Sequence, residues 1–239
     1  MRIEIIKCLK DNFSYLIIDE QNNSACVIDP SEASPIIDHV EKFKLNLKFI
    51  LNTHHHFDHV GGNLELKNKY KCKIIGFKDD KDRIPGIDIF LKNKEIWKSG
   101  EFETKIIHVP GHTSGHVCYN FYNNNVAFTG DTLFALGCGR IFEGTYKEMY
   151  DSLSVLKNLP SSTKIYCGHE YTYNNSKFCL EYDKDNVNLK RKIKEIESKL
   201  KKNMPTIPTT IKDELECNIF LRAKSLKEFS KLRDLKDNF

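Results

Sequence analysis

Leu-Asn-Thr-His-His-His-Phe-Asp-His-Val-Gly-Gly, residues 51–62, is the stretch that decides the fold, because metal-ligand side chains crowd into it. A short apolar run before it predicts a buried strand, and the two glycines at its end lead the chain into a predicted helix. Imidazole and carboxylate groups bind transition metals such as zinc and iron. We therefore expect a strand-to-helix turn in which His54 and His56 face one ion, while Asp58 and His59 serve a second.

Three further loops repeat this design, since in each of them a predicted strand ends in glycine and a ligand-type residue follows. They supply His112 in Val-Pro-Gly-His-Thr-Ser-Gly-His, Asp131 in Phe-Thr-Gly-Asp-Thr, and His169 in Tyr-Cys-Gly-His-Glu. The alternative for residues 51–62 is a polar loop that is rich in histidine by chance, because short metal motifs give false positives. The recurrence in separate loops favours a metal centre.

Together these motifs resemble the metallo-β-lactamase superfamily and, within it, the glyoxalase II family of hydroxyacylglutathione hydrolases. The resemblance covers the whole chain, and Gly-Cys-Gly-Arg at 137–140 and Cys-Gly-His-Glu-Tyr-Thr at 167–172 narrow it to glyoxalase II. It implies an α/β fold, in which a metallo-β-lactamase-like αββα sandwich, residues 1–170, forms the catalytic domain. A smaller all-helical domain, residues 171–239, would follow it and bind glutathione. Predicted strands also give way to an amphipathic helix after Tyr171.

The resemblance also implies the metal ligands. His54, His56 and His112 would hold one divalent ion, and Asp58, His59 and His169 the other, with Asp131 bridging the two. Zn²⁺ is the expected metal, and iron and manganese are the alternatives because the same ligands accept all three. Two ions about 3.5 to 4 Å apart share a bridging hydroxide, which is the expected nucleophile. Asp58 and Asp131, the two carboxylate ligands of this centre, are the expected catalytic residues. The other histidines are expected to be structural: His39, His55, His108 and His116.

The sequence lacks a recognisable proton donor for the leaving group, and this bears on the bond that is broken. No Ser-His-Asp set and no spare carboxylate pair stands out. A thioester fits that absence because its thiol, with a pKa of about 8.5, departs as a thiolate without first taking a proton. The resemblance implies S-(2-hydroxyacyl)glutathione, chiefly S-D-lactoylglutathione, as the substrate. The products would be glutathione and D-lactate, in methylglyoxal detoxification.

Four residues match the glutathione contacts of the family: Arg140, Tyr171, Arg233 and Lys236. The two C-terminal cations suit the glycine carboxylate, and the other two side chains offer donors to the peptide groups. Without the motif match, an ordinary charged helix would explain the C-terminal pair. Many relatives have lysine and tyrosine where this chain has Arg140 and Phe142, so one charge is kept and one phenolic hydroxyl is lost. That difference predicts weaker glutathione affinity.

Three other functions fit part of the pattern. A glutathione persulfide dioxygenase of the superfamily uses one iron ion, but the full second ligand set and the helical tail argue against it. A nuclease of the superfamily would bind nucleic acid with a strong salt dependence. A binding module held together by structural metal would be expected to be richer in cysteine ligands than these motifs.

The composition is that of an ordinary soluble protein, with 40% hydrophobic and 29% charged residues. No apolar run approaches the roughly 20 residues that span a bilayer, and the N-terminal residues alternate like a strand rather than a signal peptide. The eight cysteines are scattered, which is typical of reduced thiols, so we expect a cytoplasmic protein. The net charge of +4 is a weak basis for nucleic-acid binding. We expect no nucleic-acid, membrane or obligate protein partner.

Local patterns predict several further features. Ser31 or Ser34 would cap a helix that follows Asp29, and residues 145–148 have the spacing of a capping box. An apolar stripe predicts an amphipathic helix over residues 189–200. Asp29 itself resembles the first superfamily motif, a carboxylate beside the metal site, and an Asx turn is the alternative.

Overall fold

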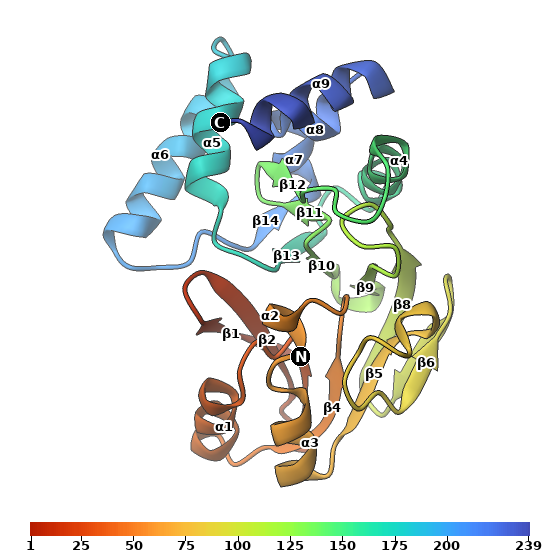
Figure 1. The fold of residues 1–239 in the computed structure, drawn as a ribbon. Helices are drawn as coiled ribbons and strands as arrows, with labels where there is room; N and C mark the ends of the chain where they lie inside the picture. The colour runs from red at the N-terminus through yellow and green to blue at the C-terminus, as the bar shows by residue number, and fades with distance from the viewer. The chain divides into compact units, whose positions relative to one another are not determined.

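The computed structural model describes residues 1–239, and the chain divides into two compact units. The first unit contains residues 1–108 and 115–124, and the second contains residues 109–114 and 125–239. Figure 1 labels most of the elements of both units. The predicted domain boundary at residue 170 lies inside the second unit and stays a prediction.

A six-stranded sheet forms the base of the first unit, and its strands follow one another in chain order. The first three strands are antiparallel hairpin partners, whereas the pairs from β3 to β6 are parallel. The strands are β1 (Arg2–Cys8), β2 (Asn12–Asp19), β3 (Ser24–Ile28), β4 (Asn46–Leu51), β5 (Lys73–Phe77) and β6 (Ile89–Leu91). Because parallel strands end at the same edge, the loops after β3, β4 and β5 meet there, where α/β sheets commonly form sites.

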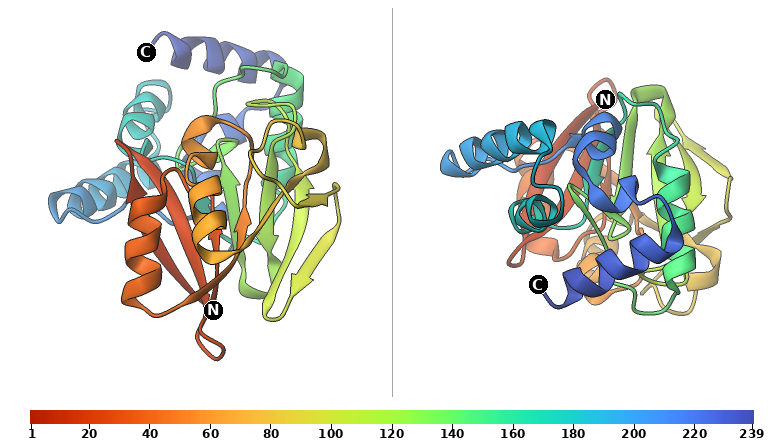
Figure 2. Two further views of the ribbon diagram at one scale, coloured as in Figure 1. Left: turned by 60° about the horizontal axis from the view of Figure 1, so that its bottom comes forward. Right: turned by 90° about the horizontal axis from the view of Figure 1, so that it is seen from above.

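Helices connect the parallel strands of this sheet. Helix α1 (Ala33–Lys42) lies between β3 and β4 in the chain, and α2 (Phe57–Val60) and α3 (Asn63–Tyr70) lie between β4 and β5. In the left view of Figure 2, α1 and α3 lie beside the strands, and Ile36, Val40 and Leu66 join the buried cluster that the strands complete. The predicted serine cap of α1 is wrong, because Glu32 occupies the N-cap position without a side-chain cap. The Ser31 amide instead donates to the hydroxyl of a serine on β2.

An antiparallel meander completes the first unit. It consists of β7 (Ile96–Ser99), β8 (Phe102–His108) and β9 (Val117–Phe121), and short 3₁₀ turns lie at Lys78–Asp80 and Tyr122–Asn124. The meander packs on the six-stranded sheet, since the rings of Trp97 and Phe49 meet edge to face at 4.9 Å. Tyr119 Oη donates to the carbonyl oxygen of Asn52 at 2.8 Å, which fixes the chain just after β4.

Short strands and six helices make up the second unit. β10 (Val126–Gly130) pairs in parallel with β13 (Lys164–Cys167), β13 pairs antiparallel with β14 (Thr209–Thr210), and β11 (Leu133–Phe134) pairs with β12 (Gly137–Cys138). The helices are α4 (Tyr146–Leu156), α5 (Thr172–Tyr182), α6 (Val187–Lys201), α7 (Ile211–Cys217), α8 (Ile219–Arg222) and α9 (Leu226–Asp237). The sequence pattern does not predict β14, which is only two residues long.

Two local predictions in the second unit are confirmed. Thr145 and Glu148 form the capping box of α4, with side-chain to backbone bonds in both directions. Helix α6 buries Leu189 and Ile196 of the predicted apolar stripe and packs beside α5, as Figure 1 shows.

Glu214 of α7 is a buried carboxylate that ties the C-terminal helices to the loop before β12. It accepts hydrogen bonds from Leu136 N at 2.8 Å, Thr209 Oγ1 at 2.7 Å and Asn218 Nδ2 at 2.8 Å. Burial raises the pKa of Glu214 to about 7, although the donors act in the opposite direction. Because the pKa is higher in the folded protein than in the unfolded chain, this group stabilises the fold at low pH. That contribution is lost as the pH rises through about 7.

Glu214→Gln is expected to remove this pH dependence. The free energy of unfolding of the variant minus that of the parent protein should be larger at about pH 8 than at about pH 5, by up to about 3 kcal/mol. Denaturant unfolding of both proteins at both pH values measures the difference, in which the carboxylates common to the two proteins cancel. A difference that stays constant with pH would contradict the expectation.

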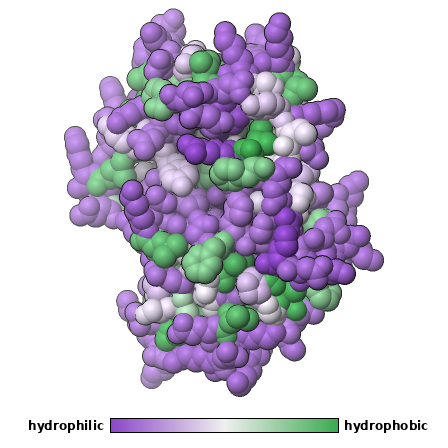
Figure 3. All heavy atoms as spheres, in the orientation of Figure 1, coloured by the Kyte–Doolittle hydropathy of each residue, from purple (hydrophilic) through white to green (hydrophobic).

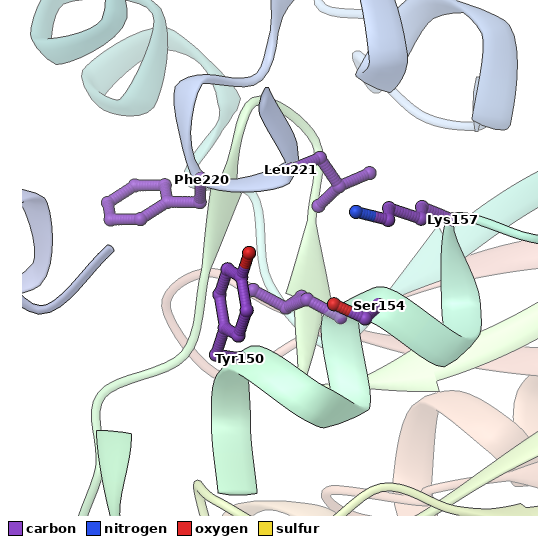
Figure 4. A pocket seen from close by; sticks show the side chains of 6 residues that line it. Tyr150, Ser154, Lys157, Phe220 and Leu221 are labelled. Atoms are coloured by element: carbon purple, nitrogen blue, oxygen red, sulfur yellow. The ribbon is translucent and has the colours of Figure 1, made fainter. Parts of the chain in front are cut away.

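Figure 4 shows a small hollow that is lined by Tyr150 and Ser154 of α4, by Lys157 directly after that helix, and by Phe220 and Leu221 of α8. On the face drawn in Figure 3, hydrophilic residues dominate and hydrophobic residues form small separate patches. None of the helices combines the length and the apolar character that a membrane-spanning helix requires.

Candidate metal centre

Residues 52–60 of the first unit, here called the histidine loop, follow β4 and run into the single-turn helix α2. His54 and His59 are buried, while His56 and Asp58 are partly exposed. The ring centre of His54 lies 4.7 Å from that of His56 and 4.2 Å from that of His59. The loop therefore brings these predicted ligands side by side.

Asp29, directly after β3, holds the histidine loop in place. Its buried carboxylate accepts hydrogen bonds from Thr53 N at 2.7 Å, Thr53 Oγ1 at 2.6 Å and His59 Nδ1 at 3.0 Å. Asp29 has a φ of +47°, a conformation that aspartate adopts more readily than most residues. The bonds go to a distant loop rather than to the adjacent backbone, so they favour the superfamily-motif interpretation over an Asx turn. These bonds hold Thr53 and the predicted ligand His59 in position.

Two more residues contact the histidine loop and are absent from the sequence prediction. Asn12 Nδ2 donates to Asp58 Oδ2 at 2.9 Å and to the Asp58 carbonyl oxygen at 3.0 Å. Asp80, which is fully buried and bonded to Arg83, lies 3.4 Å from His55 Nδ1. No local pattern could reveal the first contact, because 46 residues separate its partners.

The remaining histidines contact neighbouring groups of the protein, and their structural role stays a prediction. His116 is fully buried, and its ring stacks on that of His54 at 4.6 Å. His39 bonds through Nδ1 to a backbone carbonyl oxygen in its own helix at 2.8 Å. His108 stacks on Phe77 at 4.5 Å.

In the second unit, Asp131 lies between two histidines. Its Oδ2 atom is 3.5 Å from His112 Nε2 and 3.2 Å from His169 Nε2. All three residues are buried, with exposed fractions of 6% or less. The structure thus brings together the three ligand-type residues that the sequence placed on separate loops.

Three histidine rings are anchored through Nδ1, which leaves Nε2 as the atom for a metal. His54 Nδ1 lies 3.0 Å from Thr53 Oγ1, and His59 Nδ1 lies 3.0 Å from Asp29 Oδ2. His112 Nδ1 lies 2.8 Å from a backbone carbonyl oxygen. The Thr53 hydroxyl donates to Asp29, so all three partners act as acceptors, each Nδ1 carries the proton and each Nε2 keeps its lone pair. This donor set of imidazole and carboxylate fits a divalent metal ion.

All four predicted glutathione contacts lie in the second unit. Tyr171 stacks face to face on His169, with ring centres 4.7 Å apart. Arg140 is exposed, and its Nε atom lies 3.7 Å from an aspartate of α9. Burial lowers the pKa of Lys236, and the neighbouring guanidinium groups lower it further. Arg233 is only 3% exposed, so its guanidinium faces protein groups, and its contact with glutathione stays a prediction.

Comparison with known families divides the chain in two. Residues 10–169 match the model of the metallo-β-lactamase superfamily, and residues 170–239 match that of the hydroxyacylglutathione hydrolase C-terminus. The chain is 64% identical to the hydroxyacylglutathione hydrolase of Pelagibacter ubique over 239 residues, 100% of both chains. It is 44% identical to that of Rhodopseudomonas palustris, over 92% of this chain and 87% of the relative.

Solved structures show the same fold at lower identity. The crystal structure of ETHE1 from Myxococcus xanthus matches with a TM-score of 0.75 and 23% identity, over 98% of this chain and 90% of that one. The BLEG-1 B3 metallo-β-lactamase matches with a TM-score of 0.73 and 22% identity, over 93% of this chain and 100% of that one. These likenesses support the αββα fold class that the sequence predicted.

Proposed function

Because the chain belongs to the hydroxyacylglutathione hydrolases of the metallo-β-lactamase superfamily, we propose that it hydrolyses the thioester bond of S-(2-hydroxyacyl)glutathiones. The products are glutathione and a 2-hydroxy acid, and S-D-lactoylglutathione, which yields D-lactate, is the chief substrate. One observation carries this proposal, the 64% identity with a hydroxyacylglutathione hydrolase along the entire length of both chains. The C-terminal family match over residues 170–239 supports hydrolysis over the dioxygenase and nuclease functions.

The two family matches support assigning catalysis and glutathione binding to separate domains of the chain. Residues 1–170 form the catalytic domain, and residues 171–239 form the helical domain that binds glutathione. The point where one match ends and the next begins, between residues 169 and 170, supports this boundary.

Two divalent ions, Zn²⁺ in the first instance, would be held by seven residues: His54, His56, Asp58, His59, His112, Asp131 and His169. When bound, such a pair of ions acidifies water and polarises the thioester carbonyl. The anchored Nδ1 atoms and the imidazole and carboxylate chemistry of the set support this assignment.

The protein's own contribution is to keep these ligands in place. Asp29 orients His59 directly and His54 through the Thr53 hydroxyl. The amide of Asn12 holds the Asp58 carboxylate through one of its oxygens, Oδ2. Preorganised ligands of this kind avoid rearrangement during the reaction. The thiolate of glutathione then leaves without a dedicated proton donor, in keeping with a thioester substrate.

Glutathione would be bound by Arg140, Tyr171, Arg233 and Lys236. The stacking of Tyr171 on His169 supports this, because it places a phenol beside a proposed metal ligand. The lowered pKa of Lys236 reflects burial next to other cations, and a bound glycine carboxylate would relieve that repulsion.

Phe142→Tyr is expected to lower the KM for S-D-lactoylglutathione by about 3- to 10-fold, the worth of one hydrogen bond. Phe142 is 62% exposed, and its ring lies 5.2 Å from that of His112, so an added hydroxyl faces solvent near a proposed ligand. Steady-state kinetics measure the effect, with Phe90→Tyr, at another exposed phenylalanine, as the control. An unchanged or raised KM would rule out the contact.

We place the protein in the cytoplasm. All eight cysteines are free and buried, which suits a reducing compartment.

A spectrophotometric assay of S-D-lactoylglutathione cleavage tests the proposed reaction. Oxygen uptake with glutathione persulfide, measured on the same preparation, tests the dioxygenase alternative. Thioester cleavage without oxygen uptake is the expected result. If the protein consumes oxygen with glutathione persulfide and leaves S-D-lactoylglutathione intact, the dioxygenase function is supported and the hydrolase function is ruled out.

A further inference from the structure

Arg233, on α9, is a buried residue whose guanidinium group donates hydrogen bonds to the backbone of one turn. Its Nη1 atom donates to the carbonyl oxygen of Cys138 at 2.8 Å and lies 3.4 Å from that of Gly139. Its Nη2 atom donates to Asp237 Oδ1 at 2.8 Å. A charged side chain is rarely buried unless such partners satisfy it. Residues 138–140, here called the anchor turn, are thus fixed by a helix that lies 95 residues further along the chain.

The anchor turn also contacts His112 and the backbone beside Asp131, two of the proposed metal ligands in the second unit. The carbonyl oxygen of Arg140 accepts a hydrogen bond from His112 Nδ1 at 2.8 Å. Gly139 N donates to the carbonyl oxygen of Thr132 at 3.2 Å, beside Asp131. A Cβ atom at Gly139 would overlap the Asp131 carbonyl oxygen and come within 3.3 Å of His112 Nδ1. Any shift of this turn would therefore move both His112 and Asp131.

The bond to the anchor turn also sets which nitrogen of His112 is protonated. A carbonyl oxygen can only accept, so Nδ1 carries the hydrogen and the neutral ring presents the lone pair of Nε2. Partners of this kind fix the orientation of metal-binding histidines and raise their basicity.

We propose that Arg233 is a positioning residue of the metal centre, because it holds the anchor turn whose Arg140 carbonyl orients His112. The inference rests on the proposed function in taking His112 as a metal ligand. It goes beyond the predicted contact with glutathione, since a contact with substrate alone would act on KM and leave metal binding unchanged.

Zinc binding separates the two roles. Arg233→Met keeps much of the apolar length of the side chain but removes its donors, whereas Arg233→Lys keeps one charged donor group. Lys231→Ala, at an exposed position of the same helix, is the matched control. Zinc affinity is measured on each folded protein by competition with a chromophoric chelator, alongside kcat and KM with S-D-lactoylglutathione. We expect Arg233→Met to bind zinc about tenfold more weakly, Arg233→Lys to recover part of the loss, and Lys231→Ala to match the parent protein.

Wild-type zinc affinity in folded Arg233→Met, or a rise in KM alone, would overturn the inference. If Arg233→Met does not fold, Arg233→Lys decides, because lysine cannot bridge the anchor turn and Asp237 together. Weakened zinc binding in that variant supports the role, and unchanged binding refutes it. A parent protein that binds zinc but leaves the thioester intact would refute the proposed function, while the comparison of zinc affinities would still test Arg233.

Discussion

Asp131→Asn is expected to lower kcat/KM for S-D-lactoylglutathione by about a thousandfold, which corresponds to about 4 kcal/mol of transition-state stabilisation. Asp131 Oδ2 lies within 3.5 Å of Nε2 of both His112 and His169. Asparagine keeps the shape of the side chain but removes the negative charge that would lie between two cations. The loss should therefore appear in catalysis and in zinc content together.

Steady-state kinetics and elemental analysis of the same samples measure this effect. Asp151→Asn, which changes an exposed aspartate of the same unit, is the control and should leave both values unchanged. An Asp131→Asn protein with full zinc content and more than about a tenth of the parental kcat/KM would contradict the assigned role, because so small a loss is only about 1.4 kcal/mol.

Asp29→Ala is expected to reduce the free energy of unfolding by about 3 kcal/mol and zinc affinity by about 10- to 100-fold. The change removes the acceptor of three hydrogen bonds, two from Thr53 and one from His59, all of them buried. It also puts alanine at a φ of +47°, which aspartate tolerates better.

Denaturant unfolding and chelator competition measure the two quantities. Asp29→Asn separates the causes, because asparagine tolerates the backbone conformation and can still accept the bond from Thr53 N, but its amide cannot serve all three donors. We expect an intermediate loss for that variant and none for Asp38→Ala, at an exposed position of α1. Stability within about 1 kcal/mol of the parent in Asp29→Ala would show that Asp29 does not organise the loop.

Local features of the fold were predictable because their causes are local. The helix that follows the two glycines, the capping box at 145–148 and the apolar stripe of α6 depend on residues within a few positions of one another. The rings of His54 and His56, only two positions apart in the chain, lie 4.7 Å apart, and their binding of one shared ion stays a prediction. The predicted serine cap of α1 fails because the helix begins at Ala33, so that Glu32 rather than either serine occupies the N-cap position.

The supports of the site could not be predicted, because they join distant parts of the chain. The bond from Asn12 to Asp58 spans 46 residues, and the bond from Arg233 to the Cys138 carbonyl spans 95. The sequence marked Arg233 as a cation that would meet the substrate, and only the packing of α9 reveals that the side chain is buried. Neither periodicity nor composition records which backbone carbonyl a buried guanidinium will meet.

The most direct measurement is a zinc titration of the metal-free protein, followed through hydrolysis of S-D-lactoylglutathione. Hydrolysis should be absent at the start and should rise to a plateau at about two zinc ions per chain, in keeping with a two-metal site. Cleavage of the thioester by the fully metal-free protein, or an intact thioester in the presence of the zinc-loaded protein, would contradict the account.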